Sequence, residues 1–430
     1  MKSNLHKIGW KTAAALVVSN MIGTGVFTSL GYQLVEVQNA WSIVLLWLLG
    51  GVLALIGAFT FAELGTHYNK TGGDYVFISE GFHPFWGYLS AFTSLVVGFA
   101  APVAIAVLAM EAYLSPFEIP YLRVYTVGIL LIISALHSFS LRHSGIFQNV
   151  STVFKLLFIA FLLGIGAYCA PVPDNALQTD TNVWDEITRP GFAVSLLYVT
   201  YAYTGWNAAA YIVGEIKQPK RNLPRALVLG TMFVMVVYVL LQWVFMKLGT
   251  YTQLQNQAEV AILATQNVLG TTATRWISAG IGLQLVATMS SYTWIGPRVI
   301  HTMAQHFRLW RWLRPTNAQG VPVRAIWLQC VLVLVLMLSG SLQRVLLYTS
   351  FLLQLMGTLA VASYLKIPRR GQGFKSPLGP YLQYGYIGFS VVVLGFILWD
   401  KPTESLIGLG ILGVGAVSYF WGGREANLKV

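Results

Sequence analysis

The sequence predicts an all-α membrane protein that crosses the bilayer many times, and its composition is the first reason. Hydrophobic residues make up 56% of the 430 residues, and charged residues make up only 10%. A soluble globular chain carries roughly 25% charged residues. The mean hydropathy is +0.64. So few charges cannot cover a water-facing surface, and this excludes a soluble enzyme, a disordered protein and a coiled coil.

Apolar runs long enough to span a bilayer recur along the whole sequence. A spanning helix needs about 20 mostly apolar residues, and twelve segments meet this requirement. They lie near residues 12–35, 40–65, 84–112, 122–140, 146–169, 191–214, 226–249, 276–303, 323–340, 345–366, 384–400 and 404–421. The longest amphiphilic connector is 250–272. No long hydrophilic stretch remains, so we expect one transmembrane domain over residues 1–430.

The basic residues predict the orientation of these spans. Lys and Arg number 27 against 15 Asp and Glu, which gives a formal net charge of +12. They lie mostly in alternate loops, and the side richer in Lys and Arg is normally cytoplasmic. We therefore expect cytoplasmic N- and C-termini and a location in a bacterial inner membrane. The same bias explains the positive charge without a nucleic acid partner.

Two of the spans contain Gly and small polar residues near their middle. These stretches are Val18 to Phe27 in the first span, with Gly23 and Gly25, and Tyr198 to Asn207 in the sixth, with Gly205. Gly weakens a helix by about 1 kcal/mol relative to Ala, and unwound backbone in a bilayer is tolerated only where it lines a cavity or is buried in protein. The two spans begin two five-helix halves, near 12–169 and 191–366, and matched interruptions of this kind indicate a transporter site. Close helix packing through small residues is the alternative interpretation.

Four stretches of the sequence resemble the motifs of a known family. They are Ile22 through Phe27, Ala62 through Tyr75, Gln148 through Lys155, and Tyr201 through Pro224. These stretches are similar to motifs of the amino acid–polyamine–organocation superfamily, in its L-type amino acid transporter branch. The resemblance covers the first eight spans well and the last four mainly in number and hydrophobicity.

The resemblance implies a fold and an activity. The family fold is a LeuT-like repeat of five plus five inverted helices, followed by two C-terminal helices, here near 384–421. It implies a secondary active amino acid transporter that works by alternating access, as an exchanger or a proton-linked symporter. Thr204 stands where several carriers of large neutral amino acids have Gly. We therefore expect small neutral L-amino acids as substrates.

The resemblance also implies which residues form the binding site. Backbone N–H groups at the first interruption would bind the substrate carboxylate, in agreement with the positive end that a half-helix presents to an anion. Carbonyl groups at the second interruption would bind the α-ammonium, and the ring of Tyr201 would cover the site. The substrate-binding residues predicted in this way are Ile22, Gly23, Thr24, Gly25, Tyr201, Ala202, Tyr203 and Thr204.

Lys155 is a charged residue inside the fifth span, where a lysine costs about 2.5 kcal/mol or more. It therefore needs polar partners there, unless it extends to the inner interface. The resemblance places it beside the first interruption, where sodium-coupled relatives of the fold bind a cation. We expect its ammonium to donate to carbonyls near Ile22 and Gly23 and to hydroxyls of the eighth span, where Ser290 and Ser291 are candidates. As a structural substitute for a cation, Lys155 would make transport independent of sodium.

The sequence also bears on other functions and partners. The seven His residues are scattered, and the sequence has no Gly-x-x-x-x-Gly-Lys-Ser/Thr loop, so we expect no enzyme, no metal, no cofactor and no nucleotide-driven pump. An amino acid sensor with a transporter fold, and a carrier of cationic amino acids or polyamines, remain alternatives. Animal members of the branch are tied to a heavy-chain subunit through a Cys between the third and fourth spans. Residues 113–122 contain no Cys, so we expect no heavy-chain partner.

Overall fold

The computed structural model describes residues 7–139, 141–177, 181–338, 341–367 and 373–422. In this part of the chain the regular structure is helical, and two isolated bridges are its only β-type pairings. Nine helical stretches among these residues are long and apolar enough to cross a membrane, and two further apolar helices are shorter. The expectation of an all-α polytopic membrane protein is confirmed at this level.

The helices follow one another with short connections. The first group is α1 (Trp10–Met21), α2 (Gly25–Gln33), α3 (Ala40–Tyr68), α4 (Asp74–Gly81), α5 (Pro84–Thr93), the π-helical η1 (Ser94–Phe99), α6 (Ala100–Leu114), η2 (Ser115–Phe117), α7 (Leu122–Phe139) and α8 (Leu141–Tyr168). The second group is α9 (Val183–Ile187), α10 (Pro190–Ala202), the 3-10 helix η3 (Ala208–Glu215), α11 (Pro219–Leu248), α12 (Tyr251–Leu254), α13 (Val260–His306) and η4 (Arg308–Leu313). The last group is α14 (Val323–Leu338), α15 (Leu342–Ser363), η5 (Tyr364–Lys366), α16 (Tyr381–Asp400) and α17 (Pro402–Gly422).

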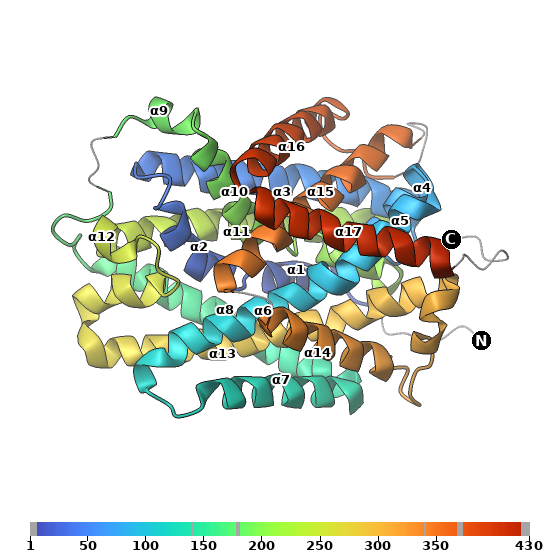
Figure 1. Cartoon of the computed structure of the whole chain (residues 1–430), viewed down its shortest axis with the longest axis horizontal. Coiled ribbons are helices and arrows are strands. Elements are labelled where there is room, and N and C mark those ends of the chain that lie inside the picture. Colours follow the sequence, from blue (N-terminus) through green and yellow to red (C-terminus); the bar gives the residue numbers. More distant parts are fainter. Residues whose placement is uncertain (1–6, 140, 178–180, 339–340, 368–372, 423–430) are drawn as a thin grey trace.

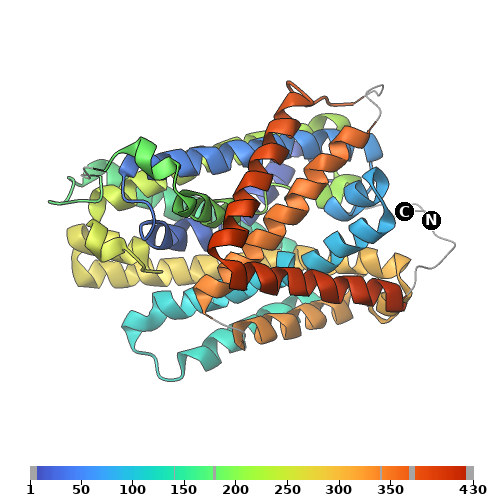
Figure 2. The ribbon, with the colours of Figure 1, turned by 45° about the horizontal axis from the view of Figure 1, so that its top comes forward.

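Most of the long helices run along the long axis of the molecule and pack side by side (Figure 1). α11 packs against α1 and α3, and α13 packs against α6 and α14. α16 crosses the bundle obliquely, and α17 packs against α5 and α15 (Figure 2). α2 is buried along its whole length, whereas α16 and α17 expose large apolar side chains such as Trp399 and Trp421. The interrupted first helix therefore lies inside the bundle, and the last two helices lie at its periphery.

Two predicted boundaries differ from the structure. α8 begins at Leu141, before the predicted start near residue 146, so Lys155 lies near the middle of a 28-residue helix. The predicted connector 250–272 is partly helical, because α12 and the first turns of α13 occupy it up to a kink at Gly270 with φ 74°. The predicted cytoplasmic ends, residues 1–6 and 423–430, lie outside the described residues.

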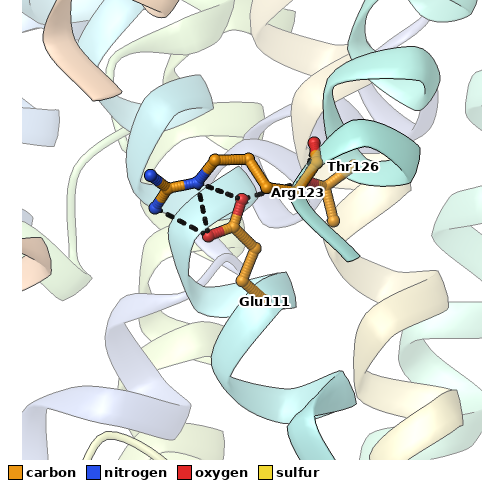
Figure 3. A network of polar contacts seen from close by, with 3 residues as sticks. All are labelled: Glu111, Arg123 and Thr126. Carbon is orange, nitrogen blue, oxygen red and sulfur yellow. Dashed lines mark hydrogen bonds and ion pairs between the residues drawn. The ribbon is translucent and has the colours of Figure 1, made fainter. Parts of the chain in front are cut away.

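An ion pair joins α6 to the start of α7 (Figure 3). Both carboxylate oxygens of Glu111 accept hydrogen bonds from the Arg123 guanidinium at 3.0 to 3.3 Å, and Oε1 also accepts from the Thr126 hydroxyl at 3.0 Å. The Arg123 side chain is 61% exposed, and an exposed pair of this kind contributes only about 0–1 kcal/mol. Its effect is local, because it fixes the geometry of the short connection between these two helices.

Candidate functional site

The predicted interruption of the first span is confirmed. α1 ends at Met21, Ile22 leaves the helical conformation with φ −72° and ψ 95°, and α2 begins at Gly25. The last carbonyl groups of a helix have no partner within it. Here side chains of α8, α11 and α13 donate to the last carbonyls of α1 and to that of Ile22, through the pairs Lys155 to Ser19, Tyr292 to Asn20, Tyr238 to Met21 and Lys155 to Ile22. Three neighbouring helices thus hold the break in place.

Lys155 makes three hydrogen bonds in the protein interior. Its Nζ lies 2.7 Å from the carbonyl oxygen of Ile22, 3.1 Å from that of Ser19 and 2.9 Å from the hydroxyl of Thr288, and its side chain is 0% exposed. An ammonium has three donors and no acceptor, so these partners use all of its hydrogen-bonding capacity. The contact with Ile22 agrees with the expectation, and Ser19 takes the place expected for Gly23.

The hydroxyl partner of Lys155 on α13 differs from the two serines proposed from the sequence. Ser290 Oγ lies 2.7 Å from Nε2 of His137, and Ser291 donates to the carbonyl of Ala287 at 3.2 Å. Ser290 faces α7, because it lies about 200° around α13 from Thr288. Ser291 lies on nearly the same face of α13 as Thr288, but one turn further along. The rotation of α13 therefore distinguishes Thr288 from Ser290, and the position along the helix axis distinguishes it from Ser291.

The start of α2 presents backbone donors that no described group accepts. The N–H groups of Thr24, Gly25 and Val26 take part in none of the hydrogen bonds among the described residues, whereas that of Phe27 donates to the Thr24 carbonyl at 3.0 Å. These donors lie at the positive end of the helix dipole, which stabilises an anion. All three residues are buried. The break therefore presents unpaired donors that suit an anion, in a place that is shielded from bulk water.

The second predicted interruption is confirmed and touches the first. α10 ends at Ala202, Gly205 has φ 99°, and η3 begins at Ala208. A Cβ atom on Gly25 would lie 2.6 Å from Cα of Ala202, and one on Gly205 would lie 2.8 Å from the carbonyl carbon of Asn20. Glycine is therefore required at both breaks for the two backbones to approach so closely.

A cavity beside the second break leaves about 900 Å³ free of protein atoms. Most of its walls come from the end of α10 and the segment that follows it, and from η1, α13 and α15, with single residues from α1, α3, α4, α5 and α16. Tyrosine, serine, threonine and amide side chains alternate with apolar ones along these walls. A mostly apolar cavity with a few placed polar groups is typical of a small-molecule site.

The structure distributes the eight predicted substrate-binding residues over three places. Tyr201 and Thr204 line the cavity. The carbonyl of Tyr201 already accepts from the backbone N–H and the hydroxyl of Thr204, at 2.9 and 2.7 Å. Tyr203 points to α3, where its hydroxyl donates to the carbonyl of Trp47 at 2.9 Å. The remaining five lie where the two breaks meet, outside the described lining of the cavity, and are Ile22, Gly23, Thr24, Gly25 and Ala202.

The π-helical turn η1 is a feature of the site that the sequence did not predict. It interrupts the apolar run 84–112, which reads as one continuous span. Ser94, Gly98 and Phe99 of this turn line the cavity. Turns of this type occur frequently at functional sites, because the extra residue changes which side chains face inward. No residue pattern in this run distinguishes it from a regular helix.

Asp74 is the one acidic residue among the described residues that line the cavity. Its carboxylate accepts from the hydroxyl of Tyr211 at 3.1 Å and from the side-chain amide of Asn207 at 3.4 Å, and no described cation forms an ion pair with it. Burial raises the pKa of Asp74 to about 6, and the bonds from Tyr211 and Asn207 oppose this shift. Asp74 is therefore mostly ionised at neutral pH. In the sequence, Asp74 is distinguished only as part of the stretch Ala62 through Tyr75.

The chain is similar to known amino acid permeases over almost its whole length. The sequence model of the amino acid permease family matches residues 8–412. The chain belongs to this family. The permease is 27% identical over 433 residues to the serine/threonine exchanger SteT of Bacillus subtilis, across 97% of each chain. It is 25% identical over 430 residues to the large neutral amino acids transporter small subunit 2 of Homo sapiens, across 97% of this chain and 80% of the relative. It is 31% identical over 272 residues to the b(0,+)-type amino acid transporter 1 of Rattus norvegicus, across 61% of this chain and 55% of the relative.

Proposed function

We propose that this permease is a secondary active transporter of small neutral L-amino acids that works by alternating access. The contact between two broken helices beside this cavity carries the proposal, because it brings unpaired backbone donors and acceptors together inside the bundle. The name of the Bacillus relative, a serine/threonine exchanger, supports substrates of this size. In the proposed cycle the permease exchanges amino acids or couples their movement to protons.

The proposed binding mode uses the backbone of both breaks. The N–H groups of Thr24 and Gly25, with Gly23 beside them, bind the substrate carboxylate. The carbonyl groups of Ala202 and Thr204 accept no hydrogen bond among the described residues, and in this proposal they bind the α-ammonium. Tyr201 covers the site from the cavity wall. Backbone groups recognise the part common to all amino acids and leave selectivity to the cavity.

We also propose the complete architecture expected from the sequence. It has twelve spans, with repeats near 12–169 and 191–366 followed by α16 and α17. The two broken helices are the first helix of each repeat. The start of α1 and the end of α17 lie at the same end of the bundle (Figure 1), which supports termini on one side of the membrane. In this proposal that side is the cytoplasm of a bacterial cell.

The side chain of Thr204 is the proposed determinant of substrate size. It lines the cavity, and its hydroxyl is fixed on the Tyr201 carbonyl. We expect Thr204→Gly to improve the affinity for leucine relative to alanine by about tenfold, because removing two carbon atoms and a hydroxyl leaves room for a larger apolar group, and a methylene in such a pocket changes selectivity by about 10- to 200-fold. The inhibition of labelled alanine uptake by unlabelled leucine and by unlabelled alanine measures this change in relative affinity. A wild-type protein that already takes up leucine faster than alanine would contradict the assignment.

A carrier of cationic amino acids or polyamines is the second candidate, and Asp74 is the observation that favours it. An ionised carboxylate in a substrate cavity attracts an ammonium or guanidinium group. Inhibition of alanine uptake by alanine, lysine, arginine and putrescine at pH 7.5 separates the two candidates. Stronger inhibition by the cations, lost in Asp74→Asn, would favour the second candidate over the first.

We propose that the permease works without a heavy-chain subunit. One relative is named a small subunit, which describes that protein. In this chain the connection between α6 and α7 has no Cys, and both cysteines, Cys169 and Cys330, are free. Counterflow of labelled amino acid into liposomes that contain only the purified chain tests this proposal and the transport activity together. Binding without flux would instead support a sensor.

A further inference from the structure

A groove at the start of α11 combines three basic side chains with apolar walls. It is lined by Lys220, Arg221 and Arg225 and by apolar residues that include Phe59, Leu229 and Phe374, and it leaves about 790 Å³ free of protein atoms. We propose that this groove binds an anionic phospholipid, with the phosphate head group on the three cations and an acyl chain along α11.

The three cations are available to a ligand. All three residues are exposed, and none of their side chains takes part in a hydrogen bond or ion pair among the described residues. Glu63, one turn of α3 beyond Phe59, accepts instead from the backbone N–H of Ser376 at 2.6 Å. Arg221 and Arg225 are four residues apart on one helix, where like charges repel. A bound anion would remove this repulsion, so the arrangement favours a negatively charged ligand.

The apolar walls identify this ligand as a lipid rather than a free anion. The rings of Phe59 and Phe374 stack with their centroids 6.5 Å apart and their planes 11° apart, and so join α3 to the segment that precedes α16. Beyond Arg225 the face of α11 continues as a stripe of exposed apolar side chains, namely Leu229, Met232, Phe233, Val236 and Leu240. Their spacing of three to four residues keeps them on one side of the helix. Cations followed by a lipid-facing stripe match a head group followed by an acyl chain.

The charge bias of membrane proteins does not explain this arrangement by itself. It accounts for basic residues near a cytoplasmic helix end, but it requires neither a groove around them nor the absence of acidic partners. Basic pockets next to spanning helices are where anionic head groups bind, and each Lys or Arg near the surface changes the affinity by about fivefold. We therefore expect a selective site that is occupied in membranes rich in phosphatidylglycerol.

The test compares lipids and variants on the purified full chain. Native mass spectrometry counts bound phosphatidylglycerol and phosphatidylcholine with identical acyl chains, and thermal unfolding is followed with each lipid and with inorganic phosphate alone. The groove variant is Lys220→Gln/Arg221→Gln/Arg225→Gln. The matched control is Arg308→Gln/Arg311→Gln/Lys366→Gln, which removes the same charge from exposed residues outside the groove.

We expect phosphatidylglycerol to bind and stabilise the wild type and the control variant, and phosphatidylcholine and phosphate to have no such effect. The groove variant should bind phosphatidylglycerol at least tenfold more weakly, since three charges are removed. The single variant Arg225→Gln should bind about fivefold more weakly, and it serves as the test if the triple variant does not fold. Equal stabilisation by the two lipids, an effect of phosphate alone, or an equal loss of binding in the control variant would overturn the proposal.

Discussion

Lys155→Ala is expected to lower amino acid transport by a factor of about ten or more while the protein remains folded. The ammonium donates to two carbonyls at the end of α1 and to Thr288 of α13. Each hydrogen bond to a charged group contributes about 1.5–3 kcal/mol, and its loss leaves buried acceptors without a donor. Because a factor of ten in rate corresponds to about 1.4 kcal/mol, one such bond is enough for the expected effect. Initial uptake rates in liposomes, normalised to the amount of inserted protein, measure it.

Lys247→Ala is the matched control for this prediction. Lys247 lies at the end of α11 and also donates to a backbone carbonyl of α8, that of Gly166, at 2.8 Å, but it does not contact either break. We expect this variant to retain most of its transport. Equal losses in the two variants would show that removing any lysine bond to a backbone carbonyl between helices has the same effect, and the anchoring role of Lys155 would then be wrong.

Gly25→Ala is expected to abolish transport. With Lys155→Ala, it is one of the two substitutions with the largest expected effects. The new methyl group would lie 2.6 Å from Cα and 2.7 Å from Cβ of Ala202, which is closer than nonbonded carbon atoms approach. Overpacking of a well-packed interior costs about 1–3 kcal/mol, and here it separates the two breaks that form the proposed site. Uptake and thermal unfolding of the purified variant together distinguish a lost site from a lost fold.

Alanine substitutions at two other glycines serve as controls for Gly25→Ala. A Cβ atom on Gly23 would lie 3.4 Å from Cγ2 of Thr288, which is near ordinary contact, and one on Gly128 in α7 would have no described atom within 4 Å. We therefore expect Gly128→Ala to behave as the wild type and Gly23→Ala to be intermediate. A Gly25→Ala variant that transports as well as Gly128→Ala would show that close contact of the breaks is not needed.

The sequence predicted both breaks because their cause is local. Gly at residues 23, 25 and 205 weakens the helix at the place where the chain leaves it, and no distant contact is needed to recognise this. The burial of Lys155 was predicted for a similar reason, since a lysine inside an apolar run must find polar partners. These features depend on residue type and on position along one span.

Other parts of the site depend on how helices rotate and pack, and the sequence did not predict them. Thr288, Ser290 and Ser291 are all polar, and the rotation of α13 together with the position of each residue along its axis selects Thr288 as the partner of Lys155. The π-helical turn at Ser94–Phe99 lies in an apolar run without any distinguishing residue. Asp74 reaches the cavity because α4 follows two glycines with positive φ, Gly72 and Gly73. The packing of the helices in three dimensions determines the partner of Lys155, the position of the π-helical turn and the place of Asp74.

We propose that Lys155 takes the place of a bound cation in a transporter that needs no sodium. Uptake of labelled alanine or serine by liposomes that contain the purified chain, with sodium replaced by choline on both sides of the membrane, tests it most directly. We expect the same uptake rate in both solutions, because the three donors of Lys155 already occupy the carbonyls and the hydroxyl beside the break. A fall to the background level of protein-free liposomes when sodium is removed would contradict it.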